Sequence, residues 1–159
     1  MKNNTVLRQL RYIFDLSDDQ MIKLFAQAEV VVTREQVSNW LKREDHEDYL
    51  SISDSQFASF LNGFIIQKRG KREGPQPPPE KRLNNNIIFR KLKIALNYKD
   101  TDIIDTYKYV RMSISKHEIS AIFRNPKQSQ YRVCEDQFLR NFLHGLQLKY
   151  RPNNGNHKS

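Results

Sequence analysis

An internal repeat sets the strongest limit on how this chain can fold. Shifted by 82 positions, the sequence aligns with itself without a gap over 63 pairs, from Asn3 with Asn85 to Ile65 with Gln147, and 12 pairs are identical. Chance pairing would give about four identities at ordinary residue frequencies. The chain therefore carries two copies of one structural unit. The identical pairs are Asn3/Asn85, Asn4/Asn86, Arg8/Arg90, Leu10/Leu92, Asp18/Asp100, Ile22/Ile104, Ser38/Ser120, Tyr49/Tyr131, Asp54/Asp136, Phe60/Phe142, Leu61/Leu143 and Gly63/Gly145.

Each copy has the pattern of about four short helices. Apolar residues recur at helical spacing, beginning with the segment from Val6 to Phe14. Between the apolar segments stand Ser or Thr residues followed three positions later by Gln or Glu, which is the capping box of a helix N-terminus. The short run 30–32 is expected to be an extended connector. The predicted capping boxes are Ser17 with Gln20, Thr33 with Gln36, Ser53 with Gln56 and Ser115 with Glu118.

These patterns predict an all-α protein made of two tandem, roughly four-helix units. A unit of about 60 residues buries little apolar surface alone. We therefore expect the copies to pack into one compact body with pseudo-two-fold symmetry. Gly63 and Gly145 lie inside predicted helices, where close approach of another helix, such as one from the other copy, would explain them. The expected divisions are unit 1 at 3–66, a basic proline-rich linker at 67–84, unit 2 at 85–148 and a disordered basic tail at 149–159.

The net charge of +9 is unevenly distributed. Residues 1–66 carry −3, whereas residues 67–84 carry +4, residues 85–148 carry +5 and residues 149–159 carry +3. The chain after residue 66 therefore carries +12. An anionic partner would be attracted to the linker, the second unit and the tail.

Composition favours a cytoplasmic protein. The only cysteine is Cys134, so no intrachain disulfide can form, and a reducing compartment is the natural setting. The N-terminal residues lack the apolar segment of a secretory signal, and no apolar run reaches the ~18–20 residues that span a bilayer. No glycine-rich phosphate loop, nucleophile elbow or metal-ligand spacing is present. We expect no cofactor, no bound metal, no small-molecule substrate and no membrane partner.

Three segments carry a family resemblance. The first is Phe60-Leu61-Asn62-Gly63-Phe64-Ile65 followed by Lys68-Arg69-Gly70. The second is Arg82-x-Asn84-Asn85-Asn86 with Lys91-Leu92-Lys93-Ile94-Ala95, and the third is Asp136-Gln137-Phe138-Leu139-Arg140-x-Phe142-Leu143-x-Gly145-Leu146. Together they resemble the YehS-like family of bacterial proteins of unknown function, with Phe64 where Leu is expected. The resemblance implies a duplicated cytosolic domain without known chemistry, and it supplies no catalytic residues.

A polar stripe on the first helix of each unit is one candidate site. Asn4, Arg8, Arg11 and Asp15 recur at helical spacing, and the second unit repeats them as Asn86, Arg90, Lys93 and Asn97. Flanking the apolar face, the stripes should reach solvent and could bind phosphates, with the asparagines adding hydrogen bonds. The alternative is that Arg8 and Arg90 pair with acidic residues of a neighbouring helix and fix the geometry of each unit.

The linker is a second candidate. Lys68, Arg69, Lys71 and Arg72 could form a phosphate-binding arm, or they could simply keep a solvated linker extended. The prolines that follow exclude a continuous helix.

The remaining chemistry-bearing residues favour structural roles. The acidic segment 44–48 is not shared by the second unit, which indicates a solvated loop rather than a metal site. Cys134 aligns with Ile52, which indicates a small buried residue, and Trp40 is expected in the core. His117 and His144 are isolated, so an enzyme would require a deep pocket lined by residues such as these or Glu118.

The functional prediction is a non-enzymatic binding module for nucleic acid or another polyanion. The candidate binding residues are Arg8, Arg11, Lys68, Arg69, Lys71, Arg72, Arg90 and Lys93. The alternative is a protein-interaction adaptor that presents a groove between the two repeats to a peptide or helix, with the charge serving solubility. The partners expected from the charge are nucleic acid or an acidic protein surface. An enzyme has no supporting motif.

Overall fold

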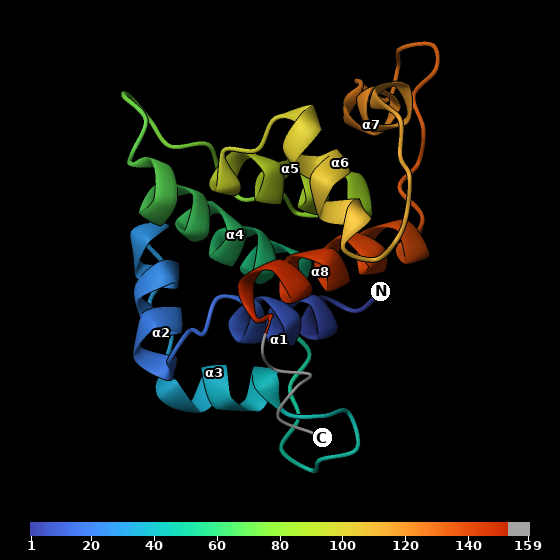
Figure 1. Ribbon diagram of the computed structural model, residues 1–159. Helices are drawn as coiled ribbons and strands as arrows, with labels where there is room; N and C mark the ends of the chain where they lie inside the picture. Colours follow the sequence, from blue (N-terminus) through green and yellow to red (C-terminus); the bar gives the residue numbers. More distant parts are fainter. Residues whose placement is uncertain (153–159) are drawn as a thin grey trace, which may run out of the picture.

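The computed structural model describes residues 1–152, and the expected tail from residue 153 onward lies outside the described residues. The described residues form eight helices and no strand. None of these helices combines the length and apolar character that crossing a bilayer requires. The helices are α1 (Asn3–Ile13), α2 (Asp18–Gln27), α3 (Arg34–Leu41), α4 (Asp54–Arg69), α5 (Asn85–Leu96), α6 (Asp100–Lys108), α7 (Lys116–Phe123) and α8 (Asp136–Tyr150) (Figure 1).

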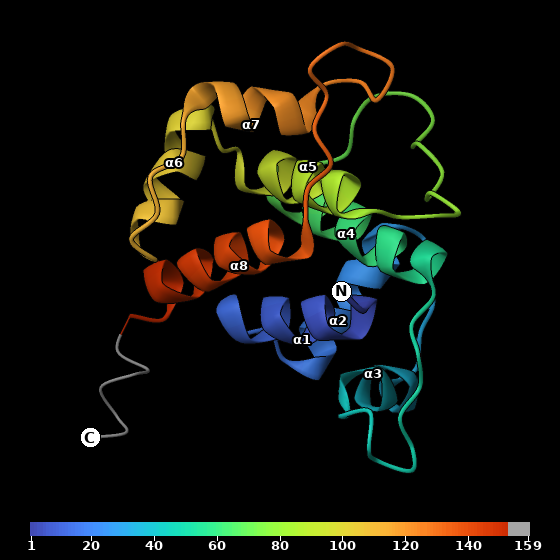
Figure 2. The ribbon, with the colours of Figure 1, turned by 90° about the vertical axis from the view of Figure 1, so that its right-hand side faces the viewer.

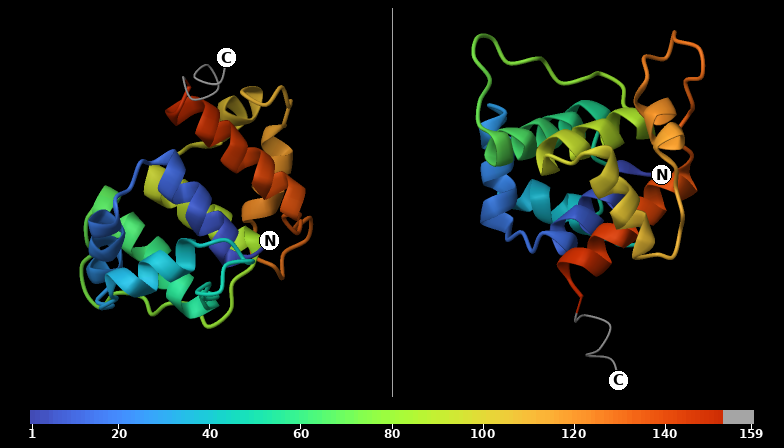
Figure 3. Two further views of the ribbon diagram at one scale, coloured as in Figure 1. Left: turned by 90° about the horizontal axis from the view of Figure 1, so that it is seen from below. Right: turned by 45° about the horizontal axis from the view of Figure 1, so that its top comes forward.

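The predicted helix starts are confirmed. In all four predicted capping boxes the Ser or Thr side chain accepts the N3 amide, while the Gln or Glu side chain accepts the N-cap amide. The run 30–32 is an extended connector, as expected. Helix α4 continues to Arg69, and α8 continues to Tyr150. The segment between α4 and α5 is not helical and arches away from the body (Figure 3).

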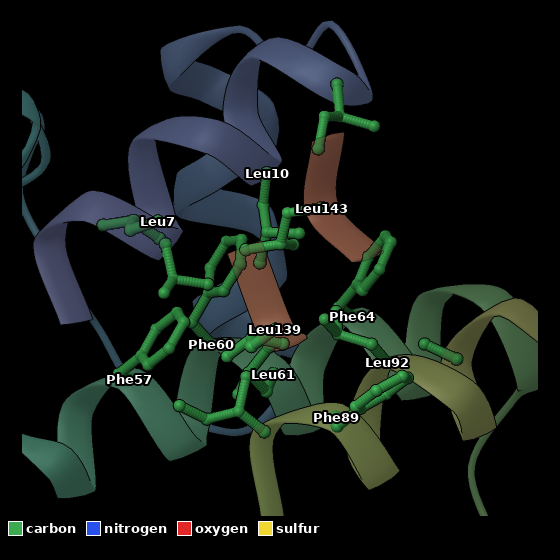
Figure 4. Close-up of a cluster of buried hydrophobic side chains, with 14 of the residues drawn as sticks. Leu7, Leu10, Phe57, Phe60, Leu61, Phe64, Phe89, Leu92, Leu139 and Leu143 are labelled. Carbon is green, nitrogen blue, oxygen red and sulfur yellow. The ribbon is translucent and has the colours of Figure 1, made fainter. Parts of the chain in front are cut away.

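Four helices make the centre of the molecule. Helix α4 contacts α5 and α1, and α8 contacts α1 and α5, so that the apolar faces of the four helices meet in one core that spans both units. Figure 4 shows this core, in which leucines and phenylalanines of all four helices point inward. Helices α2 and α3 flank the first half and α6 and α7 flank the second, so that α3 and α7 lie on opposite sides of the body (Figure 2).

The two units are related by a pseudo-two-fold axis, which is visible in exchanged contacts. The backbone N–H of Leu83, two residues before α5, donates to Asp54 Oδ2 at the start of α4, at 2.9 Å. The equivalent residue before α1 is Met1, whose amino group donates to Asp136 Oδ2 at the start of α8, also at 2.9 Å. The segment before the first helix of each unit therefore binds the last helix of the other unit, and the expected compact body is confirmed.

The helical glycines permit close packing within each unit rather than between units. A Cβ atom on Gly63 of α4 would lie 1.7 Å from the carbonyl oxygen of Leu24 in α2. A Cβ atom on Gly145 of α8 would lie 2.4 Å from the carbonyl oxygen of Thr106 in α6. Close approach of a helix was predicted, but the suggestion that it comes from the other copy is wrong, because the second helix of the same unit packs here.

Candidate anion-binding cavity

A cavity of about 580 Å³ lies where the two units meet, beneath the linker. One stripe of α4 and one stripe of α5 form its walls, each with the three- to four-residue spacing of a helix face. The C-terminal end of α2 and linker residues 70–80 complete the lining. The lining includes Ser59, Asn62, Ile65 and Arg69 on α4, Lys71, Arg72 and Glu80 in the linker, and Ile87, Arg90, Lys91 and Ile94 on α5.

The charge around this cavity is predominantly positive. Five basic side chains belong to the lining, against the carboxylates of Glu29 and Glu80. The side chains of Arg69, Lys71 and Arg72 are exposed at the rim, so they are available to a ligand entering from solvent. Cations gathered at a concave surface raise the local concentration of anions. The cavity therefore has the electrostatic character of an anion site.

Lys91 is largely enclosed, with only 12% of its side chain exposed. Its Nζ donates to Asn62 Oδ1 of α4 at 2.6 Å and lies 3.0 Å from Glu80 Oε1 of the linker. One ammonium group thus joins α5, α4 and the linker. The Lys91–Glu80 ion pair holds the end of the linker against α5 and fixes the cavity beneath it.

Two hydrogen-bonding groups on α4 remain available inside the cavity. Ser59 is only 4% exposed and belongs to the lining, and its hydroxyl makes no hydrogen bond within residues 1–152 yet is not among the fully buried unpaired atoms, so solvent in the cavity reaches it. Asn62 accepts from Lys91 through Oδ1, which leaves its Nδ2 group without an acceptor in residues 1–152. A ligand in the cavity would pair both groups in place of water.

The structure brings together half of the basic residues singled out in the sequence. Arg69, Lys71, Arg72 and Arg90 line the cavity, although Arg90 comes from a different unit than Arg69. Lys68, the neighbour of Arg69, lies elsewhere. Its Nζ sits 5.9 Å from the ring centre of Phe14 and 5.8 Å from that of Phe64, a cation–π arrangement outside the cavity lining.

The other predicted cations have structural partners. Arg8 donates to the carbonyl oxygen of Lys42 at 3.0 Å, rather than pairing with an acidic side chain as the structural alternative predicted. Arg11 lies 3.8 Å from Asp18, and its repeat equivalent Lys93 lies 3.4 Å from Asp100. The two repeat-equivalent ion pairs join the first and second helices of each unit. The basic residues of the two stripes therefore differ in role. Arg8, Arg11 and Lys93 make structural contacts, whereas Arg90 lines the cavity.

The expectation that the asparagines of the stripes reach solvent is wrong. Asn4 is 2% exposed and Asn86 is 3% exposed. Asn4 Nδ2 donates to the carbonyls of Trp40 and Leu50 at 2.9 and 2.8 Å, and its Oδ1 accepts from the Ile52 amide at 3.1 Å. Asn86 makes the equivalent bonds in the second unit, at 3.0, 2.8 and 2.8 Å, to Ile122, Arg132 and Cys134. These amides fasten the loop before the last helix to the first helix, because the loop backbone needs buried partners.

The remaining candidates occupy the structural positions that the sequence favoured. The acidic segment 44–48 is an exposed loop, and no cluster of three potential metal-ligating side chains occurs within residues 1–152. Trp40 and Cys134 are buried, and burial raises the pKa of the Cys134 thiol to about 12, so the thiol is protonated at neutral pH. His117 and His144 are exposed. Glu118 lines a smaller cavity of about 230 Å³, but its carboxylate accepts from Ser115 in a capping box.

Sequence reasoning missed Ser59, Asn62, Glu80 and Lys91 as cavity residues. Helix periodicity places Asn62 on one face with Ser59, and Lys91 on one face with Ile87 and Ile94, but it does not show that these two faces meet. Asn62 and Lys91 do lie within two segments that carry the family resemblance. The pairing of α4 with α5 across the pseudo-two-fold axis was the missing information.

Comparison with known proteins supports the duplication. A family described as "Protein of unknown function (DUF1456)" matches twice, over residues 3–70 and 85–152. The uncharacterised protein YehS of Escherichia coli (strain K12) is 40% identical over 156 residues, which cover 98% of this chain and all of the relative. No solved structure matches. The chain therefore belongs to the DUF1456 family of proteins of unknown function.

Proposed function

We propose that this protein is a binding module for nucleic acid, and that the basic cavity beneath the linker is the centre of its binding surface. The observation that carries the proposal is the convergence of Arg69, Lys71, Arg72, Arg90 and Lys91 from two helices and the linker around one cavity. Phosphate contacts supply most of the affinity of nucleic-acid binders, and arginine and lysine make most of those contacts.

The distribution of charge supports the same surface. The first unit carries −3, whereas the linker and second unit carry +4 and +5. A nucleic-acid strand approaching the molecule would be repelled by the far side of the first unit and attracted to the linker. The exposed Lys81 and Arg82, just beyond the cavity, would extend the path for the phosphate backbone.

A single strand fits this surface better than a duplex. Arginine side chains of single-strand binders contact phosphates and stack on bases, and the strand follows a positively charged groove. The protein surface beneath the linker is concave, and the linker covers part of it. A duplex would meet only the rim, through the exposed arginines and Lys71.

The test is fluorescence anisotropy with labelled single-stranded and double-stranded DNA and RNA across a salt series. The rim variant replaces Arg69, Lys71, Arg72 and Arg90 with Ala. The matched control removes four basic residues of the second unit that lie outside the cavity lining. The control positions are Lys108, Lys116, Lys127 and Arg140, all of which are exposed.

We expect single strands to bind best and binding to weaken steeply with salt. In the rim variant the negative slope of log affinity against log salt should become less steep by about 3, since each lost phosphate contact removes roughly 0.7 from its magnitude. The control should change the slope far less. Equal effects of the two variants, or no binding at low salt, would contradict the proposal. Absence of nucleic-acid binding together with a co-purifying acidic protein would instead support the adaptor function.

A further inference from the structure

We propose that the cavity beneath the linker takes one nucleoside phosphate, either as a free nucleotide or as the phosphorylated end of a strand. This inference rests on the proposed function and specifies the chemistry of its centre. Its volume of about 580 Å³ lies within the roughly 300–1,000 Å³ of small-molecule sites, so a single nucleotide is the appropriate scale.

The interior supplies donors for phosphate oxygens. Lys91 Nζ is enclosed at the boundary between α4 and α5, and it contacts Asn62 directly. The free Nδ2 of Asn62 and the hydroxyl of Ser59 lie one turn apart on α4 and belong to the same lining. Hydrogen bonds from charged or oriented donors to phosphate oxygens are stronger than those between neutral groups. These donors are positioned before any ligand arrives.

The other walls are apolar and suit a flat heterocycle. Ile65 and Ile66 of α4 face the cavity together with Ile87 and Ile94 of α5, and Pro77 covers it from the linker. The lining contains no aromatic residue, so the guanidinium planes at the rim would provide the stacking surface for a base. The base would lie between isoleucine side chains and an arginine.

Neutral polar groups among these apolar walls disfavour a simple hydrocarbon chain. The amides of Gln27 and Gln76 belong to the lining in addition to Ser59 and Asn62. Gln27 Nε2 donates to Gln67 Oε1 and Gln76 Nε2 donates to the Arg72 carbonyl, both at 2.9 Å, so each amide offers its Oε1 atom as an acceptor. An acyl chain would cover such groups without pairing them, which is costly. The edge of a base and the hydroxyls of a sugar would pair them. A nucleoside phosphate satisfies the donors, the apolar walls and the amides at once.

The cavity variants are chosen to separate this site from general electrostatics, because none of them changes the charge. Ser59→Ala removes the buried hydroxyl. Ile94→Trp fills the cavity from a position that is 45% exposed, so the larger side chain has room to fold. Ser120→Ala on α7 is the matched control, because this half-buried serine lies outside the lining.

Isothermal titration of the full chain with AMP, inorganic phosphate, and oligo-dT with and without a 5′-phosphate tests the inference. We expect AMP or the 5′-phosphorylated strand to bind more tightly than phosphate alone, and the comparison of the two identifies the source. Ser59→Ala should weaken that binding about five- to tenfold, the effect of one hydrogen bond. The same change should leave the thermal midpoint nearly unchanged, because the Ser59 hydroxyl makes no hydrogen bond within residues 1–152. Ile94→Trp should weaken binding more than tenfold, and Ser120→Ala should have no effect.

Two results would overturn the inference. One is the absence of binding by both AMP and the 5′-phosphorylated strand end. The other is binding of phosphate as tight as that of AMP with no effect of Ile94→Trp, which would indicate a surface anion site only. Strands that bind wild type and Ile94→Trp equally but lose affinity in the rim variant would leave the proposed function standing without this site. AMP binding without strand binding would leave this nucleotide site standing and would contradict the proposed binding of nucleic acid.

Discussion

The two units meet at two boundaries, α4 with α5 and α8 with α1. The repeat makes these boundaries equivalent in sequence position, but their side-chain contacts differ. At the α4–α5 boundary, Lys91 is enclosed, Arg69 stays exposed at the rim, and the linker arches over a cavity. At the α8–α1 boundary, the equivalent of Arg69 is Arg151, whose guanidinium lies 4.6 Å from the ring centre of Tyr12. Arg151 also donates to the Tyr12 carbonyl at 2.9 Å and lies 3.5 Å from Asp15.

This difference separates the residues that build the scaffold from those that build the site. The equivalents of Lys91, Asn62 and Ile94 at the second boundary are Gln9, His144 and Tyr12, so the chemistry of the cavity is not repeated. By contrast, the buried asparagines and helical glycines are identical in the two units. Duplication supplied two equivalent boundaries, and substitution together with the linker turned one of them into a basic cavity.

The largest effect is expected where the two units are most alike. Asn4→Ala and Asn86→Ala each remove three buried hydrogen bonds with nearly identical lengths. Each should lower the free energy of unfolding by about 3–4 kcal/mol, at roughly 1 kcal/mol for each bond and more where a buried group stays unpaired. Urea denaturation of both variants measures this. Losses that differ by more than about 1 kcal/mol would show that the asparagines are not equivalent.

The glycines should show a smaller but unequal effect. Gly63→Ala forces the backbone of α2 away from α4, because the added Cβ would lie 1.7 Å from a carbonyl oxygen, whereas Gly145→Ala meets the corresponding oxygen at 2.4 Å. We expect losses of about 3 and 2 kcal/mol, the range of overpacked cores, even after the higher helix propensity of Ala. Thermal unfolding with both variants in parallel tests the order. A larger loss for Gly145→Ala would contradict it.

The linker contact should distinguish the two boundaries directly. Lys91→Gln places at the α4–α5 boundary the residue type that stands at the equivalent position, Gln9, of the α8–α1 boundary. It also removes the Lys91–Glu80 ion pair. Loss of about 1 kcal/mol of local stability should speed cleavage within residues 71–82 by trypsin roughly fivefold. Gln9→Ala at the other boundary is the control and should leave that rate unchanged. An unaltered rate in Lys91→Gln would mean that the ion pair does not hold the linker.

The smallest effect concerns two strained turns that the units share. Glu29 and Arg111 are repeat equivalents that follow α2 and α6 with φ of 63° and 60°, a conformation that favours glycine. Glu29→Gly and Arg111→Gly should each raise the free energy of unfolding by about 0.5–1 kcal/mol, because the folded-state strain relieved exceeds the added entropy of the unfolded chain. Chemical denaturation of the two variants measures both gains. A loss of stability at either site would show that the side chain contributes more than the strain costs.

Much of the scaffold could be predicted because its causes are local or periodic. The capping boxes depend on residues three positions apart, and the repeat requires only comparison of the sequence with itself. The helical glycines signalled a close contact, but they could not reveal the partner, since packing between helices depends on residues distant in sequence. The asparagines were misplaced for a related reason. A polar residue beside an apolar helix face is predicted to be exposed, because the sequence does not show the backbone carbonyls to which its side chain donates.

The duplication, the helices and the excess of positive charge after residue 66 follow from the order of the residues alone. The packing of the helices, by contrast, sets which boundary carries the cavity and which basic residues share it. Arg69 and Lys68 are neighbours in the chain with the same charge, yet one lines the cavity and the other packs against Phe14 and Phe64. Adjacent residues on a helix point about 100° apart, so the packing of α5 and the linker on one side of α4 separates them.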